Sequence, residues 1–216
     1  MRNEGVGSWT ARRARKTPGQ VAIMHVGIAT SYAELHARVT RLAASLRARG
    51  IACGDRVAYL GPNHPAFCEV MFATWAAGAV FVPLNARLAT PEVAAQLADA
   101  GAAMLFCAAE RAETGLDETV AGLVRTVVLP EGVRAAGAEA GVAGYESLIA
   151  AGSAGSAGWA DEPVRLDDPG LIMYTSGTTG RAKGAVLTRF AAGLPRTATG
   201  KIAKKVLRES ESAAPG

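Results

Sequence analysis

The segment DRVAYLGPNHPAFCEVMFATWAAGAVFVPLN, residues 55–85, decides the fold of this chain. Its first part, DRVAYLGP, predicts a buried strand around Val57 and Tyr59, and its last part, AVFVPLN, predicts a second short apolar strand. The residues between them predict a helix over 65–77, which Gly78 ends. A strand, a helix and a strand in close succession indicate a parallel unit with a right-handed crossover.

The same alternation continues toward the N-terminus. Ser31 and Glu34 have the spacing of a capping box in front of a long amphipathic helix. Apolar residues then recur every three or four positions until Gly50, which is expected to stop this helix. Before it, a basic stretch at 12–16 fits one turn of a surface helix.

The alternation also continues downstream. Thr90 is expected to cap the next helix, with Pro91 at its first position and Gly101 after it. AAMLFC, residues 102–107, and RTVVLP, residues 125–130, predict two further strands. The expected fold class is therefore α/β, with alternating strands and helices and a mainly parallel sheet.

Periodicity is lost over residues 131–165, where AGSAGSAG at 151–158 is expected to be a small-residue linker. Order is expected to resume at PGLIMYTSG, residues 169–177, as an apolar strand that runs into a loop.

The net charge of +4 is unevenly distributed. From residue 181 onward, eight Lys or Arg stand against two Glu, which gives +6; the first 180 residues carry 15 positive and 17 negative charges, which gives −2. This basic tail could be an ordinary solvated helix, or it could bind nucleic acid or a membrane surface. Because Phe190 is its only aromatic residue, base stacking is disfavoured, and we expect no nucleic-acid partner.

Cysteine usage points to a reducing compartment. Cys53, Cys68 and Cys107 are odd in number and widely spaced, so they suit neither a disulfide framework nor a metal site. The three histidines lie far from any cysteine pair, and no metal bound through Cys or His is expected. No apolar run approaches the roughly 20 residues that span a bilayer. We therefore expect a cytoplasmic protein without a transmembrane segment or signal peptide.

The strand at 169–177 leads into a loop rich in glycine and hydroxyl side chains. Its residues are Thr175, Ser176, Gly177, Thr178, Thr179 and Gly180. The two glycines let the backbone approach a bulky anion, successive N–H groups can form an anion-binding nest, and Lys183 adds a positive charge. Phosphate is the expected ligand, although a generic surface turn has a similar composition.

Two common phosphate motifs do not match this loop. The NTPase pattern G-x-x-x-x-G-K-[ST] fails because Ala182 stands five positions after Gly177, where a second glycine is required. The dinucleotide fingerprint G-x-G-x-x-G is absent from the chain.

YTSGTTGRAKG, residues 174–184, resembles the phosphate loop of the AMP-forming adenylating enzymes, with Ala182 where that family usually has proline. SYAEL at 31–35 and WAAGAVFVPLN at 75–85 are also similar to this family, so the resemblance covers about 5–188. It implies that the loop and Lys183 hold the β- and γ-phosphates of ATP.

LPRTATGKIAKKVLRE, residues 194–209, resembles the last motif of the same family, in the wording of its acyl-CoA synthetases. The resemblance implies a catalytic role for Lys201, which would reach the substrate carboxylate and the α-phosphate. A cation at this position stabilises the charge that develops during adenylation.

The two motifs stand much closer together here than in the family. Family members carry between them a Y-G-x-T-E segment, whose Glu holds Mg²⁺, and a T-G-D segment, whose Asp binds ribose; neither occurs in this chain. We therefore expect an internal deletion. Residues 1–188 would be a partial N-terminal AMP-binding domain, 189–193 the junction, and 194–216 the remnant of the C-terminal domain.

The resemblance implies an acid–CoA ligase, which joins a carboxylic or fatty acid to CoA through an acyl-adenylate, with ATP and Mg²⁺, and releases AMP and pyrophosphate. Because the acyl pocket and most of the CoA site would be missing, we expect no useful turnover from this chain. The alternative is a non-catalytic fragment that binds nucleotide phosphates, or that self-associates through an exposed sheet edge.

Overall fold

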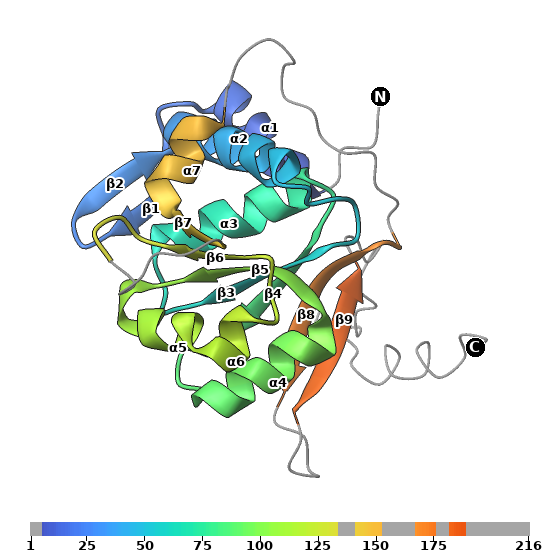
Figure 1. The fold of residues 1–216 in the computed structure, drawn as a ribbon. Helices are drawn as coiled ribbons and strands as arrows, with labels where there is room; N and C mark the ends of the chain where they lie inside the picture. The colour runs from blue at the N-terminus through green and yellow to red at the C-terminus, as the bar shows by residue number, and fades with distance from the viewer. Residues whose placement is uncertain (1–5, 134–140, 153–166, 176–181, 189–216) are drawn as a thin grey trace, which may run out of the picture.

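The computed structural model describes residues 6–133, 141–152, 167–175 and 182–188 (Figure 1). Seven strands form one sheet in the order β7-β6-β5-β3-β4-β8-β9. These strands are β3 (Arg56–Leu60), β4 (Val80–Leu84), β5 (Ala102–Cys107), β6 (Thr126–Leu129), β7 (Val142–Gly144), β8 (Pro169–Thr175) and β9 (Lys183–Thr188). Neighbours are parallel throughout, except that β9 runs antiparallel to β8. The mainly parallel α/β sheet expected from the sequence is confirmed.

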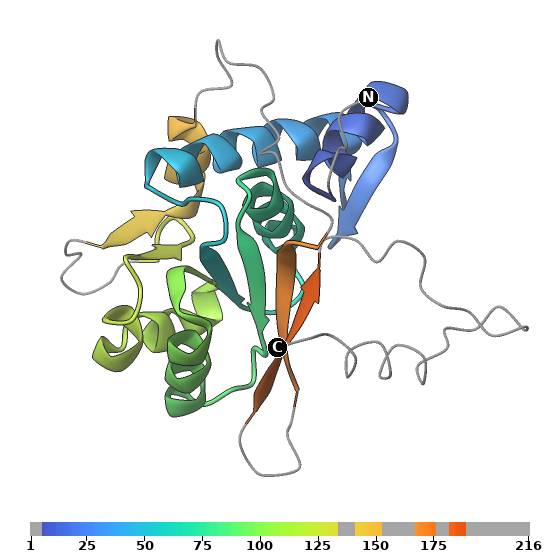
Figure 2. The same ribbon diagram turned by 90° about the vertical axis from the view of Figure 1, so that its right-hand side faces the viewer.

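Helices cover both faces of this sheet (Figures 1 and 2). The helical elements are η1 (Val6–Ser8), α1 (Trp9–Lys16), α2 (Tyr32–Ala48), α3 (Pro65–Ala76), α4 (Thr90–Ala100), η2 (Ala109–Arg111), α5 (Ala112–Leu116), α6 (Glu118–Ala121) and α7 (Tyr145–Ala151). One hydrophobic cluster joins α2, α3 and α7 to one face of the sheet, and a second joins α4, α5 and α6 to the other. The molecule therefore has three layers.

The strands alternate between the two clusters with a period of two. In β3, Val57 and Tyr59 belong to the cluster under α2, α3 and α7, whereas Ala58 and Leu60 belong to the cluster under α4. All four residues are buried, which explains why the sequence shows an unbroken apolar run rather than an alternating pattern. This sheet is the core of the molecule.

The expected start of α2 is confirmed. The Ser31 hydroxyl accepts a hydrogen bond from the Glu34 N–H at 3.2 Å, and the Glu34 carboxylate accepts one from the Ser31 N–H at 2.7 Å. This reciprocal pair satisfies two N–H groups that the first helical turn leaves open. After the helix, Gly50 has a φ of 79°, a left-handed conformation that glycine adopts without steric cost.

The expected start of α4 is wrong by one residue. Ala89 occupies the capping position, Thr90 is the first helical residue, and Pro91 follows it. The Glu92 carboxylate accepts the Ala89 N–H at 2.9 Å, and no threonine hydroxyl stands at the capping position. Gly101 ends the helix with a φ of 60°, as expected.

Several elements were not predicted, among them α5, α6 and β9. Strands β1 (Val21–His25) and β2 (Ile28–Ser31) form a separate antiparallel hairpin. Within the region where periodicity is lost, β7 adds an outer strand and α7 packs on α2. Helix α7 ends at Ala151, which was expected to be the first residue of the linker. Among the residues that the structure describes, no helix combines the length and apolar character needed to cross a membrane.

Candidate functional site

The ends of the expected phosphate loop face each other across a strand pair. Thr175 is the last residue of β8 and Lys183 is the first residue of β9, and the two are partners in the antiparallel register. Both side chains are exposed. The connection between them contains Ser176, Gly177, Thr178, Thr179 and Gly180, which lie outside the described residues, as does Lys201. The structure thus places Thr175 and Lys183 side by side at the base of the loop.

Strand β8 ends on the side of the sheet where ligands are usually bound in α/β folds. Strand β8 runs parallel to β4, and Phe81 pairs with Leu171. Thr175 therefore stands at the carboxyl end of a strand in an open parallel sheet, the position at which α/β folds form ligand crevices. The expected phosphate loop therefore follows a strand end of this kind.

Hydrogen bonds hold β8 to the helical layers near both of its ends. The Trp75 indole of α3 donates to the Gly170 carbonyl at 2.6 Å. At the other end, the Tyr174 hydroxyl donates toward the Asp99 carboxylate at 2.6 Å and the Gln96 carbonyl at 3.1 Å. Burial raises the pKa of Tyr174, and the hydrogen bond to Asp99 and the Asp99 charge raise it further. These contacts fix the strand that leads into the loop.

Sequence reasoning did not identify these anchoring residues. Trp75 and Tyr174 lie within apolar stretches and have the pattern of core residues, and their polar partners are 95 and 75 positions away, respectively. The one available signal is chemical, because a buried indole N–H or phenol O–H usually needs a hydrogen-bond partner.

The outer strand β9 is exposed along its whole length. Within the described part of the chain it pairs only with β8. Its side chains Val186 and Leu187 are 56% and 46% exposed, and Met173 on β8 is 46% exposed. An unpaired strand edge with apolar side chains is a surface on which another strand can pair.

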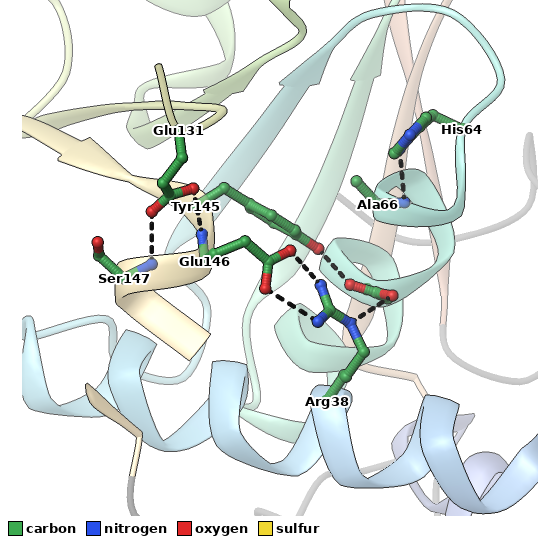
Figure 3. Close-up of polar contacts among 8 residues, drawn as sticks. Arg38, His64, Ala66, Glu131, Tyr145, Glu146 and Ser147 are labelled. Atoms are coloured by element: carbon green, nitrogen blue, oxygen red, sulfur yellow. Dashed lines mark hydrogen bonds and ion pairs between the residues drawn. The ribbon is translucent and has the colours of Figure 1, made fainter. Parts of the chain in front are cut away.

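A second polar cluster joins α2, α3 and α7 (Figure 3). The Arg38 guanidinium donates from Nε to Glu69 at 2.9 Å and from its two terminal nitrogens to Glu146 at 2.9 and 2.6 Å. The Tyr145 hydroxyl donates to the other oxygen of Glu69 at 2.6 Å. Burial raises the pKa of Tyr145 well above its usual value, and the Glu69 charge adds to this. Every charge in the cluster is therefore paired.

The cysteines are free, as the sequence predicts. Cys107 is buried at the end of β5, and its thiol donates to the Arg111 carbonyl at 3.0 Å. Burial raises the pKa of this thiol to about 12, so it is protonated and unreactive at neutral pH. No group of three or more His, Cys, Asp or Glu side chains that could hold a metal occurs among the described residues.

Known proteins are similar to this chain over most of its length. The chain is 51% identical over 188 residues to a feruloyl-CoA synthase of Amycolatopsis sp, which covers 87% of this chain and 34% of the relative. It is 39% identical over 183 residues to an indoleacetate–CoA ligase of Aromatoleum aromaticum, covering 85% of this chain and 34% of the relative. The chain thus spans about a third of the length of these curated relatives.

The fold and the family agree with these similarities. The N-terminal domain of FACL13 from Mycobacterium tuberculosis superposes with a TM-score of 0.71 at 31% identity, over 86% of this chain and 44% of that one. Residues 10–207 match the AMP-binding enzyme family. This match covers most of the chain and spans both Lys183 and Lys201. The chain therefore belongs to the AMP-binding enzyme family, and its relatives are acyl-CoA ligases.

Proposed function

We propose that this chain derives from an acid–CoA ligase and that it binds the phosphates of ATP without completing the ligation. The observation that carries this proposal is the direct pairing of Thr175 with Lys183 at the carboxyl end of β8. The pairing sets a lysine ammonium beside a glycine- and hydroxyl-rich connection at the edge of the sheet where ligands bind. Trp75 and Tyr174 hold the strand that carries it.

A polyphosphate is the ligand that this chemistry suits best. Backbone N–H groups and hydroxyls can donate to several phosphate oxygens at once, and Lys183 supplies a point charge. In the complete reaction a carboxylate oxygen attacks the α-phosphorus and pyrophosphate leaves; the CoA thiol then attacks the acyl carbon and AMP leaves. Lys201 would stabilise the charge that develops on the α-phosphate in the first step. Mg²⁺ would accompany the triphosphate.

An aromatic carboxylic acid is the substrate class that we propose for the parent enzyme. The relatives at 51% and 39% identity are a feruloyl-CoA synthase and an indoleacetate–CoA ligase, whereas a long-chain-fatty-acid–CoA ligase of Mycobacterium tuberculosis matches at 36%. This ranking favours an aromatic acid over the fatty acid that family frequency alone suggests.

We propose further that the chain is joined internally at residues 189–193. The family match runs on to residue 207, although the relatives are about three times longer than the aligned region, and the Y-G-x-T-E and T-G-D segments are missing between the two lysine motifs. Amplifying the gene across codons 180–205 tests this proposal. A product as short as the sequence implies supports a genuine deletion, and a much longer product overturns it.

The test of function is ATP binding measured by calorimetry on the 216-residue chain, with Lys183→Ala and the control Lys16→Ala. Lys16 is an exposed lysine at the end of α1 and belongs to neither β8 nor β9. We expect Lys183→Ala to weaken binding about tenfold, roughly 1.4 kcal/mol, and Lys16→Ala to leave it unchanged. Equal effects of the two variants, or no binding at millimolar ATP, would overturn the phosphate site.

A pyrophosphate-release assay with ATP, CoA and either ferulate or a long-chain fatty acid tests the expected lack of turnover. We expect no release above a protein-free control. Sustained release that depends on one of these acids would show that the chain is an active ligase. It would also identify the acid class.

Self-association is a second candidate function, and the exposure of β9 favours it. All six residues of this strand are exposed, and its outer backbone edge faces no other described strand. A second copy could add its own β9 to this edge and extend the sheet. Sedimentation velocity over a range of concentrations tests this directly; a purely monomeric chain at all concentrations would exclude it.

A further inference from the structure

A cavity of about 510 Å³ opens between the carboxyl ends of β3 and β5. Its wall includes Tyr59 and His64 from the β3 side and Phe106 and Glu110 from the β5 side. The volume lies in the range of small-molecule sites. No residue of β8 or β9 that the structure describes lines it.

This cavity occupies the point at which the order of the strands reverses. Strand β3 leads through α3 to β4 on one side of it, whereas β5 leads through α5 and α6 to β6 on the other side. Helix α3 covers one face of the sheet, and α5 and α6 cover the other. Adjacent parallel strands whose connections leave to opposite faces form the crevice in which open α/β sheets bind ligands.

The wall is mainly apolar and aromatic. Tyr59, Phe106 and Tyr145 contribute aromatic rings, and Phe106 and Tyr145 meet edge to face with centroids 6.0 Å apart. Proline, alanine, valine and leucine side chains fill most of the remaining wall. A flat hydrophobic ligand would fit this surface.

The charges around the cavity disfavour an anion. Its lining holds four glutamates and one arginine, a formal charge of −3. The arginine, Arg38, is already engaged by Glu69 and Glu146, so it is not available to a phosphate or carboxylate (Figure 3). The Glu131 carboxylate accepts the N–H groups of Glu146 and Ser147 at 2.7 and 2.6 Å.

Glu110 differs from the other acidic residues of the cavity. It is exposed at the rim, and it makes no hydrogen bond or ion pair with another residue that the structure describes. Its carboxylate is therefore available to a ligand. We propose that this cavity binds a compact aromatic amine, with the ring against the partly exposed Tyr145 and the ammonium group at Glu110.

The test compares three probes of nearly equal size, namely tyramine, 4-ethylphenol and 4-hydroxyphenylacetate, which carry a positive, a zero and a negative charge. Binding to the 216-residue chain is followed by chemical-shift changes in ¹H–¹⁵N spectra. We expect tyramine to bind at least about tenfold more tightly than the anion and to shift signals of residues around the cavity. Equal affinities, a preference for the anion, or no binding of any probe at millimolar concentration would overturn the proposal.

Two variants locate the binding. Glu110→Gln should weaken tyramine binding about two- to fivefold and leave 4-ethylphenol unchanged, whereas Glu113→Gln, at a nearby exposed glutamate outside the cavity, should change neither. Ala109→Trp should fill the mouth of the cavity and abolish binding of both probes. The same spectra report whether each variant is folded. If a folded Ala109→Trp variant still binds tyramine, the ligand binds outside this cavity.

Discussion

Arg38 of α2 donates to the Glu69 carboxylate of α3 at 2.9 Å, and Glu69 is 4% exposed. The same guanidinium reaches Glu146 on α7, so one side chain connects three helices on one face of the sheet. Because the Tyr145 hydroxyl is the other partner of Glu69, the buried carboxylate depends on Arg38 for its only charge compensation within the described residues. This pairing adds a polar connection to the apolar packing of Leu148 and Ile149 that joins α7 to the core.

Arg38→Met should lower the free energy of unfolding by about 3 kcal/mol, because it leaves a buried carboxylate without its cation. The value is at the low end for buried pairs since the Arg38 side chain is 33% exposed. Urea unfolding measures this change. The control is Arg41→Met, which removes an exposed arginine from the same helix and should alter stability by less than about 0.5 kcal/mol. Equal losses in the two variants would contradict the role of the ion pair.

Acidification below about pH 6.5 should destabilise the protein through His36. Burial lowers the pKa of His36 in the folded state, and the charge of Arg15 lowers it further. As the pH falls through the ordinary histidine range, the unfolded chain takes up the proton more readily than the folded one, and stability is lost. Urea unfolding at steps between about pH 7.5 and about pH 5.5 should show this slope, and His36→Gln should reduce it. An unchanged slope in that variant would assign the effect to other groups.

Tyr174 and Asp99 should be coupled by about 1 kcal/mol, because the phenol donates to this carboxylate at 2.6 Å. A double-mutant cycle of Tyr174→Phe and Asp99→Ala, measured by urea unfolding, isolates this term. Pairing Tyr174→Phe with Glu118→Gln, on a different helix, provides the comparison and should be additive within about 0.5 kcal/mol. Additivity in both cycles would show that the hydrogen bond does not hold β8 in place.

Val186→Lys should weaken any self-association through β9 by at least about tenfold, since a lysine on an exposed strand edge opposes pairing with another strand. Val186 is 56% exposed, so the folded monomer should tolerate the change. Leu123→Lys is the control, because Leu123 is an exposed apolar residue outside the sheet. Sedimentation velocity measures the dissociation constant; a similar loss in both variants would point to general hydrophobic association.

Local signals predicted the fold well, but long-range side-chain contacts were out of reach. The capping box at Ser31 and the glycine after α2 act within one helical turn, so the sequence is sufficient to place them. The start of α4 was misplaced by one residue because Thr90 has a side chain suited to the capping position, whereas Ala89, which occupies that position, has none. Strand β7 was missed because three residues beside a glycine-rich stretch carry too little periodicity.

The candidate sites were predictable to different degrees. The strand that leads into the loop was predicted from a continuous motif, whereas β9 and the pairing of Thr175 with Lys183 were not predicted. The cluster of Arg38, Glu69 and Tyr145 and the cavity beside it could not be predicted. Glu146, the residue of α7 that contacts Arg38, lies 108 positions after it in the sequence. Such a contact depends on how the layers pack, which no local pattern specifies.

The uneven pairing of the sheet implies an order in which the fold opens. Strand β3 pairs with β4 and with β5 through five residue pairs each, whereas β8 meets β4 through one, Phe81 with Leu171. Local unfolding should therefore begin with the β8–β9 arm, while the β3–β4–β5 centre opens only with the whole molecule. Thr175 and Lys183, the base of the proposed phosphate loop, belong to this less protected arm. If the loop binds a triphosphate as proposed, the ligand would stabilise an arm that otherwise opens before the centre of the sheet.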